Sequence, residues 1–421
     1  MAVNVTDKIL RRICSISNHP IAKLDKRLRV LYVNGLGACM YELSKGNAII
    51  KMSFSVWAKS ILQDIVVDST IWKKDHNAIC EVTSTKIMGF DFPSMDYQLF
   101  FDVFYLTRLN GMNIILKCEK IYNYLLKVCG PSNALKDVFN FFKEGKICSE
   151  IAHSLILHKE KNEWIFRQRE KKILVVANVS AGKSTLVNAL IGHRLNRAMN
   201  RACTSKIVSL HNKVSNDGIT VRHNDGSFTY HDEVTAVNSD DFIEASFPFN
   251  STLENSHICL IDTPGVNNSE DLRHRQITED AIKKNDYDAI IYVSNCQYFG
   301  TFDEQSLLSL LKAKTSKPIF FVLNQLDRFK KKDDSIEGIV EHYQEDLVRL
   351  GFNEPKIFPL SAYAALFMKL RKEEMDEEDQ EERIKYEKKF QQGYYNLPSY
   401  VEESTFDPTG IGLLEQRLKE L

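Results

Sequence analysis

The chain has 421 residues, of which 43% are hydrophobic and 26% are charged, and its formal net charge at pH 7 is −1. This length predicts two domains rather than one core, and the near-neutral charge gives no evidence of a nucleic-acid-binding protein. Nine cysteines with no C-x-x-C pair and no Cys/His cluster argue against structural zinc and disulfides, which indicates a reducing compartment.

The first 170 residues predict an all-α domain. They carry 24 Lys and Arg against 17 Asp and Glu, whereas the remainder carries 31 against 39, so this domain is mildly basic. Apolar residues recur at helical spacing in the stretches 28–43, 96–109, 114–128 and 134–142. Turn signals fall at Asn34-Gly35, at residues 89–93, at Asn110-Gly111 and at Gly130-Pro131. This pattern predicts about five or six helices.

The polar stretch 158–172 predicts a further helix that continues into a second domain, so we place the boundary near residue 170. Beyond it, short apolar runs alternate with helical segments, which predicts an α/β domain with a mostly parallel sheet. The runs are residues 173–177, 206–210, 258–261, 289–293, 318–323 and 356–360. Asn224-Asp225-Gly226 within residues 219–231 predicts a hairpin and hence an antiparallel edge.

The apolar strand at residues 173–177 runs into a loop of small residues and then into a helix. The residues of this segment that could surround a nucleotide are Ala177, Asn178, Val179, Ser180, Ala181, Gly182, Lys183, Ser184 and Thr185. This order is that of a phosphate-binding loop in its required context of strand, loop and helix. It predicts a nucleoside triphosphate site at this point of the sheet.

Each residue type in the loop has a physical reason. Gly182 lets backbone N–H groups approach the phosphates, and the helix that follows points its positive dipole end at them. Lys183 would neutralise the β- and γ-phosphates, and the Ser184 hydroxyl would bind Mg²⁺. Ala177 replaces the usual first glycine; its methyl group disfavours a positive φ, so we expect binding to survive in weakened form.

A second motif, Asp262-Thr263-Pro264-Gly265, follows the apolar run 258–261. An acidic side chain in this place reaches Mg²⁺ through water, and the Gly265 N–H can bond the γ-phosphate. A third motif, Asn324-Gln325-Leu326-Asp327, follows the run 318–323. Asp327 can accept hydrogen bonds from N1 and N2 of guanine, which adenine cannot offer in that arrangement, so the motif predicts GTP rather than ATP.

The base site has one further element. Ser361-Ala362 follows the run 356–360, where a backbone N–H can bond guanine O6. In the base motif itself, Gln325 stands where Lys is more common, and it keeps the aliphatic stem that covers the base while losing the charge.

The residue that positions the attacking water is the least specified part of the sequence. Thr204 is our candidate for the Mg²⁺ ligand and water-positioning residue, and an ordinary loop threonine is the alternative. No glutamine follows the D-T-P-G motif, because Val266, Asn267 and Asn268 come next. Water must therefore be positioned by another group.

Taken together, N-x-S-A-G-K-S-T-L-V-N-A-L, A-C-T-S-K-I, D-T-P-G-V-N and N-Q-L-D resemble the dynamin superfamily, especially bacterial dynamin-like GTPases, over residues 171–421. The resemblance implies a P-loop GTPase domain that binds GTP or GDP with Mg²⁺, preceded here by the helical domain of residues 1–170. It also implies that a K⁺ or Na⁺ ion lies near Ser180, and that two GTPase domains pair across the nucleotide. The implied catalytic set is Ser180, Lys183, Ser184, Thr204, Asp262 and Gly265.

Three functions follow as alternatives. The first is a cytoplasmic, self-pairing GTPase that moves its helical domain, which could also hold a protein partner. The second is a GTP-binding switch with little turnover. The third, a ribosome-assembly GTPase, would need an RNA-binding appendage that the sequence does not indicate. Full dynamin-like proteins continue into a helical trunk and a lipid-binding tip, so membrane binding stays open.

Overall fold

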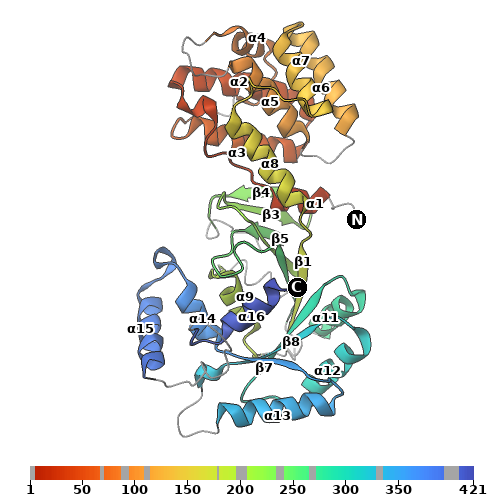
Figure 1. Cartoon of the computed structure of the whole chain (residues 1–421), viewed down its shortest axis with the longest axis vertical. Helices are drawn as coiled ribbons and strands as arrows, with labels where there is room; N and C mark the ends of the chain where they lie inside the picture. Colours follow the sequence, from red (N-terminus) through yellow and green to blue (C-terminus); the bar gives the residue numbers. More distant parts are fainter. Residues whose placement is uncertain are drawn as a thin grey trace. The chain divides into compact units, whose positions relative to one another are not determined.

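The computed structural model describes residues 5–66, 71–86, 94–108, 114–177, 180–195, 206–233, 241–264, 272–328, 335–392 and 407–421. The chain divides into two compact units (Figure 1). The helical unit comprises Met1–Gln168 with Asp225–Tyr230, and the P-loop unit comprises Arg169–Asn224 with His231–Leu421.

The helical unit contains more helices than the sequence pattern predicts. Its helices are α1 (Val5–Arg11), α2 (Lys26–Ser44), α3 (Ala48–Leu62), α4 (His76–Ser84), α5 (Met95–Arg108), α6 (Ile114–Cys129), α7 (Asn133–Glu144) and α8 (His153–Arg167). Polar caps define several starts, such as Asn47, whose side chain accepts hydrogen bonds from the backbone N–H groups of Ile49 and Ile50. The four helices predicted from periodicity are confirmed as α2, α5, α6 and α7, within a residue or two at each end.

The predicted turn at Asn34-Gly35 is wrong. Both residues lie inside α2, and a Cβ atom on Gly35 would come within 2.7 Å of Val82 Cγ2 of α4. Glycine is therefore used here for close helix packing rather than for a turn. The turn at Gly130-Pro131 is confirmed, since α6 ends at Cys129 and Gly130 has a φ of +77°. The signals at residues 89–93 and at Asn110-Gly111 fall outside the described residues.

The predicted helix over residues 158–172 extends too far. Helix α8 ends at Arg167, because Gln168 takes an extended conformation and its N–H bonds back to Ile165 and Trp164. Lys171 already begins the first strand. The step from helical to strand backbone therefore takes only a few residues.

A sheet of nine strands in the order β4-β3-β5-β2-β6-β1-β7-β8-β9 lies mostly in the P-loop unit, and only β4 falls largely in the segment grouped with the helical unit. The strands are β1 (Lys171–Ala177), β2 (Val208–Asn212), β3 (Ile219–His223), β4 (Phe228–His231), β5 (Phe242–Phe247), β6 (Ile258–Asp262), β7 (Ala289–Asn295), β8 (Ile319–Asn324) and β9 (Lys356–Pro359). Strands β6, β1, β7, β8 and β9 run parallel, whereas β2 runs antiparallel to β6. The predicted parallel sheet with an antiparallel edge is confirmed, and β5 is the one strand that the pattern missed.

The helices of this unit are α9 (Lys183–Ile191), α11 (Leu272–Lys284), α12 (Phe302–Lys314), α13 (Ile336–Arg349), α14 (Ala362–Lys369), α15 (Glu377–Gln391) and α16 (Ile411–Lys419). Helix α15 is rich in charged residues and carries an ion pair between Arg383 and Glu387, four residues apart. None of the helices within the described residues is long and apolar enough to cross a membrane.

The parallel strands indicate which edge of the sheet can bind a ligand. Their carboxyl ends meet at one edge of the sheet, which is the usual ligand-binding edge of such folds. Ala177, Asp262, Asn324 and Pro359 are the last residues of β1, β6, β8 and β9, so every predicted nucleotide motif begins at this edge.

Candidate functional site

The loop after β1 turns back through residues of positive φ before helix α9 begins. Ser180 has a φ of +63°, and Gly182, which caps α9, has a φ of +86°. A Cβ atom on Gly182 would lie 2.4 Å from Asn324 Nδ2, so only glycine fits. Asn178 and Val179 of the predicted site fall outside the described residues.

The prediction that the Ala177 methyl group opposes a required positive φ is wrong. Ala177 is the last residue of β1, is fully buried, and pairs in parallel with Val293 of β7. It is not among the described non-glycine residues with positive φ. The replacement of glycine by alanine therefore costs nothing in backbone conformation at this position.

Lys183 and Asp262 meet at the centre of the site. The Lys183 ammonium group contacts the Asp262 carboxylate directly, and their side chains are only 7% and 1% exposed. The parallel pairing of β1 with β6 brings the two together, and the Thr263 hydroxyl donates to the Val175 carbonyl oxygen at 2.8 Å, which fixes the D-T-P-G segment against β1. Gly265 falls outside the described residues.

Asn324 joins three of the predicted motifs. Its Nδ2 donates to the carbonyl oxygen of Ala181 in the phosphate loop at 2.9 Å, and its Oδ1 accepts from the Ala362 N–H at 3.0 Å. The Ala362 N–H, one of the backbone groups of the Ser361-Ala362 motif that could bond guanine O6, is thus bonded to a protein side chain in this structure. Because Asn324 is buried, these bonds hold the phosphate loop and the base-site segments in fixed positions relative to each other.

Gln325 contacts the phosphate loop as well. It has a φ of +71°, and its Nε2 donates to the Ser180 carbonyl oxygen at 2.7 Å, while its Oε1 accepts from Asn295 Nδ2 at 3.1 Å. The side-chain amide therefore supports the loop through hydrogen bonds in addition to any contact of its stem with a base. Sequence reasoning missed Asn295, although its place at the end of β7, on the ligand edge, is the signal that could have found it.

Asp327 lies at the predicted base site, next to Ser361. The Ser361 hydroxyl donates to Asp327 Oδ1 at 2.7 Å and also caps α14. Tyr386 of α15 places its hydroxyl 3.5 Å from Asp327 Oδ2. The cavity beside these residues has a volume of about 240 Å³, and its walls are formed by Gly182, Thr185, Asn324, Gln325, Asp327, Arg328 and Tyr363.

A cysteine borders this site but offers no nucleophile. Burial and the neighbouring Asp327 carboxylate raise the pKa of Cys296 to about 12, so its thiol stays protonated at neutral pH.

The loop after α9, residues 194–206, contains three arginines, and the structure describes residues 194, 195 and 206 of it. Thr204, Arg197 and Arg201 fall outside the described residues. Arg194 pairs with Asp379 of α15 at 2.6 Å, and its guanidinium lies 5.7 Å from the centre of the Phe367 ring. Its side chain is thus held against its own domain and is only partly presented to solvent.

The residues present fit a magnesium–nucleotide complex. Gly182, with its positive φ, opens α9, whose first backbone N–H groups can bind a phosphate, and the Asp262 carboxylate and the Ser184 hydroxyl are hard oxygen ligands of the kind that Mg²⁺ prefers. The Lys183 ammonium supplies the positive charge that a triphosphate requires. The cavity beside Asp327 adds a separate compartment for the base.

Residues 173–326 match the profile of the dynamin family. Over 123 residues the chain is 29% identical to dynamin-like protein A of Bacillus subtilis, covering 28% of this chain and 10% of that protein. Over 192 residues it is 24% identical to the GTPase Era of Actinobacillus pleuropneumoniae, covering 45% of this chain and 48% of Era. The matches thus span a tenth to about half of these relatives.

Two solved structures are similar at low identity. One is an oligomerised bacterial dynamin pair, described as sensing and tethering membranes over long range, with a TM-score of 0.39 and 14% identity over 94% of this chain and 57% of its own. The other is Era bound to MgGDPNP and 16S ribosomal RNA, with a TM-score of 0.27 and 17% identity over 47% of this chain and 52% of its own. The P-loop unit of this chain thus resembles the dynamin family over residues 173–326, and the Bacillus subtilis relative points to the bacterial dynamin-like proteins.

Proposed function

We propose that this chain binds GTP with Mg²⁺ and hydrolyses it to GDP and phosphate in the cytoplasm. The observation that carries the proposal is the arrangement around Asn324, which bonds both the phosphate loop at Ala181 and the base-site segment at Ala362. A phosphate site and a base site held by one buried side chain form a single compartment for one nucleotide.

Different residues of the chain would contact the phosphates and the Mg²⁺ ion. The Lys183 ammonium group, which contacts Asp262 here, would neutralise the β- and γ-phosphates, and Asp262 and Ser184 would hold Mg²⁺, with Asp262 acting through water. The Gly265 N–H would donate a hydrogen bond to the γ-phosphate, and Thr204 would be a further Mg²⁺ ligand. Bound Mg²⁺ supplies charge neutralisation at the phosphates, and the protein supplies the orientation.

Guanine selection follows from a carboxylate in the base compartment. Asp327 accepts from guanine N1 and N2 while Ser361 holds its other side, so the carboxylate is oriented before the base arrives. The half-exposed ring of Tyr363, on the wall of the same cavity, covers the base.

We also propose that two copies pair through their P-loop domains and that pairing stimulates hydrolysis. The support is that no glutamine follows the D-T-P-G motif, so the usual water-holding side chain is missing from that place in one domain. A K⁺ or Na⁺ ion near Ser180 would supply charge in the place of an arginine. GTP-driven pairing would then move the helical domain and any protein partner that it holds.

The same missing glutamine favours a second candidate, a switch that holds GTP with little turnover. Specific GTPase activity measured over a hundredfold range of protein concentration, with K⁺, Na⁺ or neither, distinguishes the two. A paired enzyme shows activity per molecule that rises with concentration. Flat and very slow turnover, with a monomer in light scattering at saturating GTP transition-state analogue, contradicts pairing and leaves the switch.

A further inference from the structure

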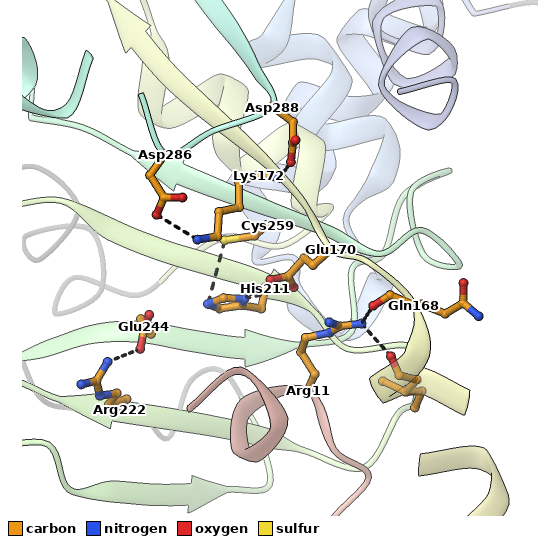
Figure 2. Close-up of polar contacts among 11 residues, drawn as sticks. Arg11, Gln168, Glu170, Lys172, His211, Arg222, Glu244, Cys259, Asp286 and Asp288 are labelled. Atoms are coloured by element: carbon orange, nitrogen blue, oxygen red, sulfur yellow. Dashed lines mark hydrogen bonds and ion pairs between the residues drawn. The ribbon is translucent and has the colours of Figure 1, made fainter. Parts of the chain in front are cut away.

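A second cluster of reactive side chains lies at the other end of the central strands. Cys259 is the second residue of β6, His211 is on β2, and Glu170 directly precedes β1. The antiparallel register sets His211 opposite Cys259, and the parallel register sets Lys172 opposite Cys259. Figure 2 shows the three side chains pointing toward one another.

Hydrogen bonds orient the histidine ring in this cluster. Both carboxylate oxygens of Glu170 lie near Nδ1 of His211, at 3.1 and 3.0 Å, and Cys259 Sγ lies 3.9 Å from Nε2 (Figure 2). The side chains of Glu170 and His211 are 6% and 3% exposed, and Cys259 is 1% exposed. One ring nitrogen is thus held by a carboxylate while the other faces a thiol.

This is the arrangement that metal-binding histidines use. Such a histidine donates one ring N–H to a carboxylate, which leaves the other nitrogen as the ligand atom. Zn–S bonds of about 2.3 Å and Zn–N bonds of about 2.0 Å at a tetrahedral angle separate sulfur from nitrogen by roughly 3.6 Å. The observed 3.9 Å needs only a small adjustment.

Charge and ligand type point to the same class of ion. A thiolate and a carboxylate together balance a divalent cation, which is required in a site so little exposed. The nearby Lys172 ammonium is paired with Asp286 at 3.0 Å, so a neighbouring carboxylate offsets its charge. Sulfur and imidazole ligands select zinc-like ions over Mg²⁺ and Ca²⁺.

The same cluster has two alternative interpretations. A catalytic thiol needs access and a lowered pKa, whereas Cys259 is buried, and burial raises the pKa of its thiol. A purely structural network, in which His211 donates from Nδ1 to Glu170 and accepts at Nε2 from the Cys259 S–H, uses the same contacts, and metal binding distinguishes the two.

We propose that this cluster binds a thiolate-preferring divalent metal ion, with Zn²⁺ as the natural occupant. Cys259 Sγ and His211 Nε2 are the ligand atoms, and Glu170 is the positioning residue that holds the ring through Nδ1. The site joins β2 and β6 to the segment that enters β1, so the metal fastens the sheet at this point. The absence of a sequence motif is no objection, because the ligands come from separate strands.

The test uses the full-length reduced protein and Co²⁺ as a spectroscopic probe, with Zn²⁺ as the competitor. We expect a thiolate-to-cobalt charge-transfer band with one-to-one stoichiometry, lost when Zn²⁺ is added and absent in Cys259→Ser and in His211→Asn. Glu170→Gln, which keeps a hydrogen-bond acceptor for Nδ1, should weaken binding by about 10- to 100-fold, the effect usual for such supporting residues.

Controls separate this site from misfolding and from the nucleotide site. Cys296→Ser removes an equally buried thiol of the same domain and should leave the band unchanged. Circular dichroism and melting curves of each variant show whether it has folded. No charge-transfer band in folded wild type, or an unchanged band in folded Cys259→Ser, overturns the proposal. Complete loss of binding in Glu170→Gln contradicts its positioning role.

Discussion

Strands β1 and β6 carry a buried cluster of charged or reactive side chains at each end, and the two clusters are built in different ways. At the carboxyl ends, Lys183 at the start of α9 and Asp262 at the end of β6 flank loops whose residues form recognisable motifs. At the amino ends, His211 and Cys259 meet only because β2 pairs with β6, and neither residue lies in a recognisable sequence motif. A site built from loops can thus be read from sequence, whereas a site built across strands needs the register of the sheet.

If the two ends are independent sites, changes at one should leave the other intact. The largest effect is expected for Lys183→Ala, which removes a charge-assisted contact to two phosphates worth about 2 to 3 kcal/mol or more, or roughly 30- to 150-fold in affinity. Titration with a fluorescent GTP analogue measures it. Lys171→Ala, at the other end of β1, is the matched control and should keep wild-type affinity. Lys183→Ala leaves the Asp262 carboxylate without its ammonium partner, so the melting temperature of Lys183→Ala must be measured in parallel.

The next largest effect concerns the base. Asp327→Asn should lose the preference for GTP by about 10- to 150-fold, because an amide cannot accept from both N1 and N2 of guanine. The amide oxygen can still accept from the Ser361 hydroxyl, so the fold should persist. An amide can instead donate to a carbonyl at that ring position, so the variant should gain affinity for xanthosine triphosphate. Competition assays with the three nucleotides measure this, and unchanged selectivity would show that Asp327 does not contact the base.

A smaller effect is expected at the support of the phosphate loop. Gln325→Ala removes the bonds to the Ser180 carbonyl oxygen and to Asn295, so nucleotide affinity should fall about fivefold, the value of one ordinary hydrogen bond. Gln297→Ala, an exposed glutamine close by, is the control. Equal affinities of the two variants, measured by titration, would mean that the loop holds its shape without this amide.

The smallest expected effect, that of Cys259→Ser on GTP affinity, tests most directly whether the two sites are independent. Cys259→Ser should abolish cobalt binding yet change GTP affinity by less than about twofold, since roughly 10 Å of strand separates Cys259 from Asp262 at about 3.3 Å per residue. Lys183→Ala should weaken GTP binding and leave cobalt binding unchanged. Joint loss of both activities in a folded Cys259→Ser protein would show that the two ends are coupled.

The same contrast explains what the sequence could and could not predict. The parallel sheet and the motifs at its edge were predictable because apolar runs and small-residue loops report directly on strand ends. Strand β5 was missed because its interior holds polar residues, including Glu244 and Ser246, that interrupt an apolar run. Gly35 was misjudged because sequence does not tell a glycine that turns the chain from one that lets two helices approach.

The hydrogen-bond and ion-pair partners of individual side chains were also not predictable from the sequence. The hydrogen bonds of Gln325 to Ser180 and Asn295, and the pairing of Arg194 with Asp379, depend on segments far apart in the chain. No local pattern encodes such contacts. For the same reason, the argument against zinc from cysteine spacing holds only for ligands that are close in sequence.

The central claim is that the P-loop domain holds one guanine nucleotide with Mg²⁺ in a single compartment. The most direct measurement is the displacement of a fluorescent GTP analogue from the full-length protein by unlabelled GTP and by ATP, with and without Mg²⁺. The account predicts that GTP displaces the analogue at far lower concentration than ATP and that removing Mg²⁺ weakens triphosphate binding. Equal displacement by ATP, or no binding of the analogue to folded protein, would contradict it.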